Sequence, residues 1–99
     1  MDEKIELPKI GDIIVEEFLE PLGITSYRLA KDLGVSTSSI LDLVHNKRKI
    51  SVEMALRLSK YFGTTSEFWL NMQNELDLRE AREKLESDLN KIPVCKKTA

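Results

Sequence analysis

Apolar residues recur along this chain with the spacing of helices that are buried on one face. The repeats are clearest over residues 10–22, 29–33, 40–44 and 54–62, where apolar positions lie three or four residues apart. No segment alternates apolar and polar residues over the length of a strand. The pattern therefore predicts an all-α protein.

Boundary residues divide this pattern into five helices. The first is expected from about Gly11 to Leu22, and Pro21 should either end it near Leu19 or distort it there, because proline has no amide hydrogen. The other four are expected at about 26–33, 37–45, 52–62 and 66–90, the last being an extended C-terminal helix. Residues that cap helix starts precede these four: Thr25 or Ser26, Ser36, Ser51, and the pair Thr64 and Thr65. Left-handed residues are expected at the ends of three of them, at Gly34, Asn46 and Gly63.

The core is expected around a cluster of aromatic residues. Four of the six aromatic residues lie between Tyr61 and Trp69, and helical spacing explains Tyr61, Phe68 and Trp69 as core residues. A weaker apolar stripe continues along the C-terminal helix, at Leu78, Ala81, Leu85, Leu89 and Ile92. This stripe can cover the same domain or pack on another subunit. Because the preceding helices already supply the core positions, we expect the second.

Length and composition fit one small folded domain over residues 1–99. Hydrophobic residues make up 41% of the chain and charged residues 32%, a balance typical of globular proteins. The single cysteine, Cys95, excludes an intramolecular disulfide. The chain has no apolar run of the roughly 20 residues that span a membrane, and its start, MDEKIE, lacks the pattern of a signal peptide. A cytoplasmic protein that does not enter membranes is expected.

The segment over residues 26–46 has the features of a helix-turn-helix. Two short helices are joined by a tight turn at Gly34, and such a pair crosses steeply, so the residue at the contact must be small. Ala30 meets this need, and Ile40 and Leu43 are placed to lock the second helix onto the first. The opposite face of the second helix is then free to enter the major groove of DNA.

Residue types on this free face suit the reading of base edges. Hydroxyl groups donate or accept hydrogen bonds there, Asp42 can accept from a cytosine amine, and Leu41 or the methyl group of Thr37 can touch a thymine methyl group. The face carries Thr37, Ser38, Leu41, Asp42 and His45. His45 is the only histidine and has no ligand-spaced partners, so we expect a polar or phosphate contact from it and no metal site.

Charge and helix starts indicate how a phosphate backbone would be held. The chain has a net charge of -2, but residues 25–65 contain seven bases and three acids, so the positive charge lies in the middle segment. A local basic patch on an acidic protein can hold DNA while the remaining surface discourages non-specific binding. The candidate phosphate contacts are Ser26 and Ser36 at helix starts and the basic connector Lys47, Arg48 and Lys49.

The spacing of Ala30, Gly34 and Ile40 resembles that of the lambda-repressor-like (XRE) class of helix-turn-helix proteins. A closer resemblance is to the HigA-type antitoxins, also catalogued as virulence-associated protein I. It is carried by EEFLEPLGIT (16–25), NKRKIS (46–51), MALRLSKYFGTTSEFWLNMQ (54–73) and DLREAR (77–82). The chain departs from that family at Asn46, where glycine is usual, and at Ser38 and Ser39, where basic residues are common.

This resemblance implies a five-helix fold and a defined function. It implies a homodimer that binds double-stranded operator DNA, represses its own promoter, and binds and silences a toxin that cleaves mRNA. It also implies that Thr37, Ser38 and Asp42 face bases and that Ser26 faces phosphate.

Two other functions remain open on the residues alone. One is a regulator of the same fold that has no toxin, and only the product of the neighbouring gene separates it from an antitoxin. The other is a toxin-binding module with little DNA binding, which Asp42 and the scarcity of lysine and arginine on the helix over 37–45 favour slightly. No paired carboxylates, catalytic triad or phosphate-binding glycine loop supports an enzyme, and no cofactor is expected.

Overall fold

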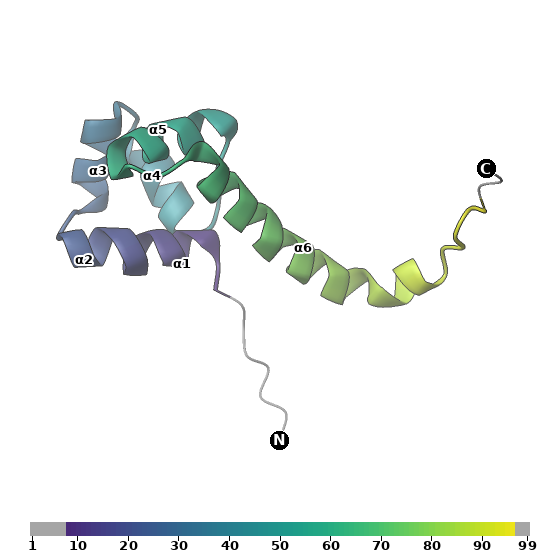
Figure 1. Ribbon diagram of the computed structural model, residues 1–99. Coiled ribbons are helices and arrows are strands. Elements are labelled where there is room, and N and C mark those ends of the chain that lie inside the picture. The colour runs from purple at the N-terminus through teal and green to yellow at the C-terminus, as the bar shows by residue number, and fades with distance from the viewer. Residues whose placement is uncertain (1–7, 97–99) are drawn as a thin grey trace, which may run out of the picture.

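The computed structural model describes residues 8–96, and over that range the chain contains helices and no strands. The elements in order are α1 (Ile10–Ile14), a π-helical turn (Val15–Leu19), α2 (Glu20–Leu22), α3 (Ser26–Leu33), α4 (Thr37–Val44), α5 (Val52–Phe62) and α6 (Ser66–Asn90). α1, the π-helical turn and α2 run as one continuous helix, so the predicted all-α arrangement of five helices is confirmed (Figure 1). The MDEKIE segment, on which the expected localisation partly rests, lies outside the described residues.

Hydroxyl side chains cap the starts of the last four helices. In each case the backbone amide three residues ahead donates to a side-chain oxygen, that of Thr25, Ser36, Ser51 and Thr65. Each contact satisfies one of the amides that an α-helix leaves unpaired at its start. The four predicted starts are therefore confirmed. The third of the five predicted helices ends within one residue of its expected end, since α4 ends at Val44 and His45 is its C-cap.

The first helical segment continues through Pro21 by changing its hydrogen bonding. In the π-helical turn the amide of Glu20 donates to the carbonyl of Val15, five residues back. A wide turn of this kind is one way in which a helix absorbs a break in its regular ladder, and Pro21 follows directly with no amide to place. Of the two alternatives predicted for this site, the distortion is confirmed and an end near Leu19 is wrong.

The wide turn also shifts which residues of this segment are buried. Leu19 is 5% exposed, whereas Leu22, which regular helical spacing places on the inner face, is 58% exposed. Leu19 follows the buried Ile14 by five residues, the spacing of a π-helical turn rather than an α-helical one.

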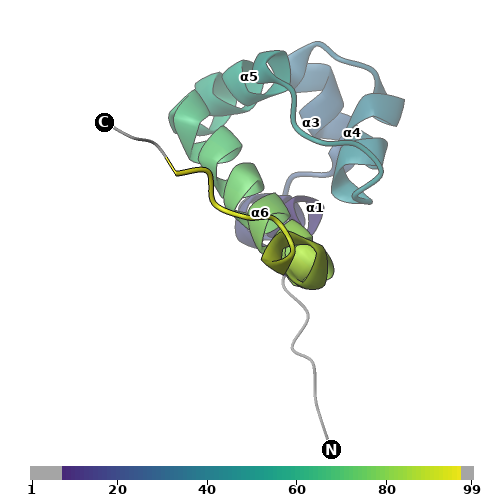
Figure 2. The ribbon, with the colours of Figure 1, turned by 90° about the vertical axis from the view of Figure 1, so that its right-hand side faces the viewer.

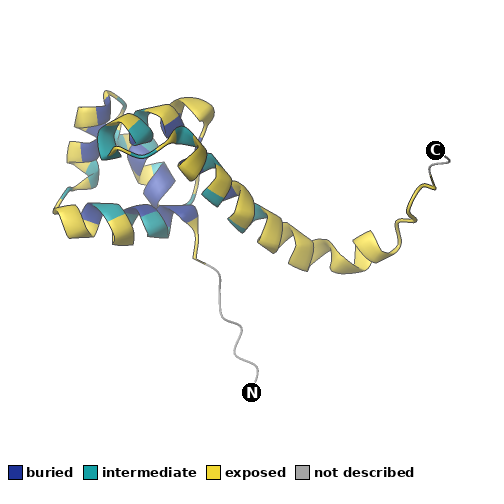
Figure 3. Ribbon diagram, viewed as in Figure 1, coloured by how far each residue is buried: buried dark blue, intermediate teal, exposed yellow. Residues whose placement is uncertain are grey.

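The core lies where α1, α3, α4, α5 and the first half of α6 meet (Figure 3). Its largest fully buried side chains are Trp69, Ile14, Leu29, Ile40, Leu43 and Leu58. The indole nitrogen of Trp69 donates to the Thr64 hydroxyl over 2.7 Å, so the buried ring keeps a partner for its one polar group. Phe68, also predicted as core, is 41% exposed and packs edge-on against Trp69. Adjacent residues of a helix point in different directions, so only one of the two rings reaches the centre.

α6 projects beyond the packed helices (Figure 1). Its 25 residues span about 37 Å at the rise of an α-helix. Trp69 and Gln73 are buried near its start, whereas every residue from 78 to 90 is exposed (Figure 3). No helix within residues 8–96 combines the length and apolar character needed to cross a membrane.

Candidate nucleic-acid interface

α3 and α4 form the helix-turn-helix at one edge of the molecule. α3 lies between α4 and α5 in the perpendicular view (Figure 2). Ala30 on α3 is 1% exposed, and Ile40 and Leu43 on α4 are 0% and 1% exposed. Gly34 turns the chain between the two helices at φ 75°, a conformation that glycine adopts at little cost. These residues hold the inner face of α4 and leave its other face outward.

α1 fixes the end of α4 from a second direction. Asn46 has the predicted left-handed backbone, at φ 62°, and its Oδ1 accepts from the amide of Gly11 over 2.7 Å. Its Nδ2 donates to Asp12 over 3.2 Å. A Cβ on Gly11 would lie 2.5 Å from the carbonyl oxygen of Leu43 and 2.6 Å from that of Val44, so α1 approaches α4 this closely only because residue 11 is glycine.

The predicted base-contacting residues all lie away from the interior. Ser38, Leu41 and His45 are exposed, and Thr37 and Asp42 are half-buried. Positions 38, 41, 42 and 45 are three or four residues apart, so they share one face of α4. The outward face of α4 thus presents polar side chains around one leucine, with a buried apolar face behind it.

Arg48 of the basic connector lies beside this outward face. Its Nη2 is 3.8 Å from the Asp42 carboxylate, and its Nη1 donates to the Ser39 hydroxyl over 3.4 Å. The Ser39 hydroxyl also hydrogen bonds with that of Ser36 over 2.8 Å. Asp42 is the only acidic residue of α4, and an exposed pair of this length contributes about 0–1 kcal/mol. The pair therefore offsets the charge of Asp42 without fixing Arg48 in place.

The other predicted phosphate contacts do not form a single patch. Ser26 is half-buried at the start of α3, and the Ser36 hydroxyl is engaged in capping α4, accepting from the Ser39 amide over 3.1 Å. The Lys47 side chain is exposed and has no hydrogen bond or ion pair within residues 8–96. Lys49 points to α6, where its ammonium group lies 3.0 Å from Asp77.

Sequence reasoning missed the residues that hold the connector, namely Ser39, Gln73 and Asp77. Gln73 carried a usable signal, because it stands four residues after Trp69 on the buried side of a helix, where a polar side chain needs a partner. Ser39 and Asp77 carried none, because their partners are set by how the connector folds back. The sequence predicted Gly11 only as a residue at the helix start. Its contact with Asn46 joins positions 35 apart in the chain, and no local pattern indicates such a contact.

A second polar cluster joins α3 to α5. The Tyr61 hydroxyl donates to the Asp32 carboxylate over 2.6 Å, and Nε of Arg28 lies 3.4 Å from the same oxygen. The hydrogen bond from Tyr61 lowers the pKa of Asp32, and the same bond raises the pKa of Tyr61. The cluster braces α3 on the side away from α4.

Comparison with known proteins points to the same class as this geometry. The family model described as helix-turn-helix matches residues 15–70. Virulence-associated protein I of Dichelobacter nodosus is 44% identical over 93 residues, which cover 92% of this chain and 86% of that protein. The structure of Pseudomonas aeruginosa antitoxin HigA with the higBA promoter matches with a TM-score of 0.85 and 34% identity, covering 92% of this chain and 100% of that one. Antitoxin GraA in complex with its operator matches with a TM-score of 0.85 and 32% identity, covering 98% and 99%.

The fold and the outward face of α4 thus define a helix-turn-helix protein. The chain belongs to the XRE-type helix-turn-helix family, in the group that includes virulence-associated protein I and the HigA antitoxins. This confirms the resemblance found in the sequence. The family consists of DNA-binding regulators and antitoxins and is not a family of enzymes.

Proposed function

We propose that this chain is the antitoxin of a toxin–antitoxin module and that it acts in the cytoplasm as a homodimeric repressor of its own operon. The observation that carries the proposal is the outward face of α4, whose polar side chains lie away from the interior while Ile40 and Leu43 bury the opposite face. Its support from related proteins is that the matched HigA and GraA structures hold a promoter and an operator.

The proposed binding mode inserts α4 into the major groove with its N-terminus first. Ser38 and Thr37 then meet base edges, and Leu41 meets a thymine methyl group. Lys47 and Arg48 supply attraction to phosphates that is independent of sequence. One protomer offers few cations, so useful affinity requires two protomers with their α4 helices about 34 Å apart, one turn of DNA.

The proposed second partner is a toxin that cleaves mRNA. Support for it comes from the antitoxin names of the matched HigA and GraA structures. Co-expression with the product of the neighbouring gene, followed by pull-down, tests it. A stable complex with a small basic protein supports the antitoxin, whereas the absence of such a partner leaves an orphan repressor.

Replacement of Ser38 by glutamate tests the groove-binding role of α4. The new carboxylate would face the phosphates and base acceptors of the groove, so we expect Ser38→Glu to abolish the shift of upstream DNA in a gel while the circular dichroism spectrum stays unchanged. Ser87→Glu is the matched control, because it adds the same charge at an exposed serine on α6. An unchanged shift for Ser38→Glu would remove α4 from the groove.

A toxin-binding module with little DNA binding is the second candidate. α4 contains no lysine or arginine, and Arg48, which lies beside it, is paired with Asp42. This candidate predicts a co-purifying partner and no saturable, salt-sensitive shift of upstream DNA by the wild-type protein at low ionic strength.

A further inference from the structure

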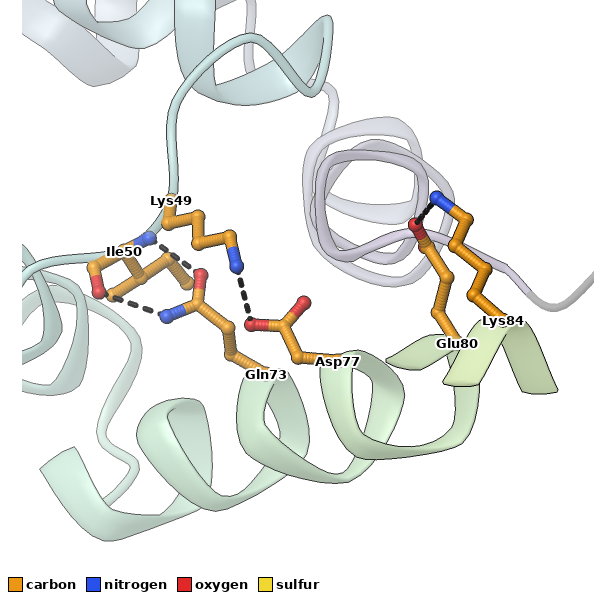
Figure 4. A network of polar contacts seen from close by, with 6 residues as sticks. All are labelled: Lys49, Ile50, Gln73, Asp77, Glu80 and Lys84. Carbon is orange, nitrogen blue, oxygen red and sulfur yellow. Dashed lines mark hydrogen bonds and ion pairs between the residues drawn. The ribbon is translucent and has the colours of Figure 1, made fainter. Parts of the chain in front are cut away.

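The end of the basic connector is attached to α6 by two contacts one helical turn apart (Figure 4). Gln73 binds the backbone of Ile50, and Asp77, four residues further along α6, binds the side chain of Lys49. Because residues four apart on a helix lie on the same side, α6 holds two consecutive residues of the connector region.

The Gln73 contact anchors the backbone. Its Oε1 accepts from the amide of Ile50 over 2.5 Å, and its Nε2 donates to the carbonyl of Ile50 over 2.9 Å. Gln73 is 8% exposed and Ile50 is 4% exposed, so loosening this contact would leave both backbone groups without partners in the interior. The backbone at Ile50 is therefore held against α6, and Lys49 starts within reach of Asp77.

The surrounding charges leave Asp77 as the partner of Lys49. Glu80, the next acid along α6, is hydrogen bonded to Lys84 over 3.1 Å, and this bond lowers the pKa of Glu80. A cavity between α6 and the start of α1 is lined by Asp77 and Glu80 on the α6 side and by Lys9, Arg48 and Lys49 on the other. Lys49 thus has a carboxylate partner on α6, unlike Lys47, whose side chain has no partner within residues 8–96.

We infer that Asp77 masks Lys49 and so limits the number of cations that the connector offers to a phosphate backbone. The inference rests on the proposed function, in which the connector meets DNA. Lys47 and Arg48 remain available to phosphates, because the Lys47 side chain has no partner within residues 8–96 and Arg48 has only long, exposed contacts with Asp42 and Ser39. Lys49 is less available, although its side chain is 74% exposed, because its ammonium group already has a carboxylate 3.0 Å away and Gln73 holds the adjoining backbone against α6.

Asp77→Asn, Lys49→Gln and the double variant test this masking. Asp88→Asn is the matched control, because it makes the same change at an exposed position of α6. Two readouts are used: the slope of log affinity for upstream DNA against log salt concentration, and the salt concentration at which each variant elutes from heparin. Heparin is a polyanion without an operator sequence, so the second readout does not depend on the proposed function.

Asp77→Asn is expected to steepen the slope by about 0.9 per protomer, or about 1.8 for a dimer, because each freed Lys49 displaces one more counterion. It should also elute from heparin later than Asp88→Asn. Lys49→Gln alone should leave the slope at the wild-type value, and in the double variant the gain from Asp77→Asn should vanish. Thermal midpoints should stay within a few degrees of the wild type, since an exposed ion pair stabilises little.

Three results would overturn the masking: equal elution of Asp77→Asn and Asp88→Asn, a gain that persists in the double variant, or a slope that Lys49→Gln alone flattens by about 0.9. The second would mean that Asp77 repels DNA directly, and the third that Lys49 already contacts phosphate. If wild-type protein fails to shift upstream DNA but the heparin results hold, the proposed function fails and the masking stands.

Discussion

At the scale of single residues, the contact between Tyr61 and Asp32 makes the fold sensitive to pH at both extremes. The hydrogen bond lowers the pKa of Asp32 below its ordinary value of 3.8, so an unfolded chain binds this proton more readily. The stabilisation is therefore present above that value and is lost as the pH falls through the folded pKa. The pKa of Tyr61 is raised above 10.0, so its stabilisation is present below that pH and is lost as the pH rises through the folded pKa.

Tyr61→Phe removes this hydrogen bond and should flatten the acid side of the stability profile. We expect its thermal midpoint to fall less than that of the wild type between about pH 5 and pH 3, because the pKa of Asp32 returns toward its ordinary value. Tyr27→Phe is the control, since Tyr27 is 66% exposed. Thermal unfolding followed by circular dichroism measures both profiles, and parallel curves for Tyr61→Phe and the wild type would contradict the prediction.

Asp42 is an example of a residue whose position, but not whose partner, can be predicted from the sequence. Helical spacing placed it on the outward face of α4, and the structure agrees, because that placement follows from local geometry. The predicted role as a hydrogen-bond acceptor for cytosine stays a prediction, and Asp42 also has an unforeseen neighbour in Arg48. Such a neighbour depends on how the connector after α4 folds back toward the helix. The spacing of residues along the chain does not predict that fold.

At the scale of helices, the packing of α1 against α4 depends on one missing methyl group. Replacing glycine by alanine inside a helix ordinarily stabilises it by about 1 kcal/mol. At Gly11 the added Cβ would lie 2.5–2.6 Å from the carbonyl oxygens of Leu43 and Val44 and from Oδ1 of Asn46. Two of these atoms belong to the backbone, so α1 has to move away, and overpacking of this kind costs about 1–3 kcal/mol.

We therefore expect Gly11→Ala to destabilise the protein despite its better helix propensity. The free energy of unfolding, measured in urea, should fall by about 1–3 kcal/mol. Glu16→Ala, at an exposed position of the same helical segment, should stay within about 0.5 kcal/mol of the wild type. A stabilised Gly11→Ala would show that α1 moves freely and does not support the end of α4.

The sequence predicted where the helices start more accurately than it predicted the course of the first helix. A capping hydroxyl accepts a hydrogen bond from an amide only three residues ahead, so Ser36 and Ser51 mark the starts of their helices through local sequence alone. Two separate requirements produce the π-helical turn before Pro21. The chain has to absorb the missing amide, and it has to keep Leu19 in a core built by distant residues. The missing amide of Pro21 can be read from the sequence, whereas the burial of Leu19 by distant residues cannot.

At the scale of the whole molecule, α6 divides into two parts. Its first half packs into the core through Trp69 and holds the connector through Gln73 and Asp77. Within residues 8–96 nothing buries its second half, and Leu78, Leu85 and Leu89 are each 45% exposed there. The second half thus belongs to the same helix that holds the connector.

We propose that this stripe on α6 is where two copies pair, and Leu85→Glu tests it. In a symmetric pair each substitution acts twice, and burying one leucine stabilises an interface by about 1.5–3 kcal/mol, so the pair should weaken by about 3–6 kcal/mol. That is at least a hundredfold in Kd, so sedimentation equilibrium should show the monomer–dimer midpoint of Leu85→Glu at least a hundredfold above that of the wild type, and the operator shift should weaken accordingly.

Ser87→Glu is the control for this prediction too, because it places the same charge on the same helix outside the leucine stripe. It should remain a dimer and bind upstream DNA like the wild type. A dimeric Leu85→Glu would place the interface elsewhere on the molecule. A monomeric Leu85→Glu that still binds with wild-type affinity would mean that one α4 is sufficient, and the requirement for two helices about one DNA turn apart would then be wrong.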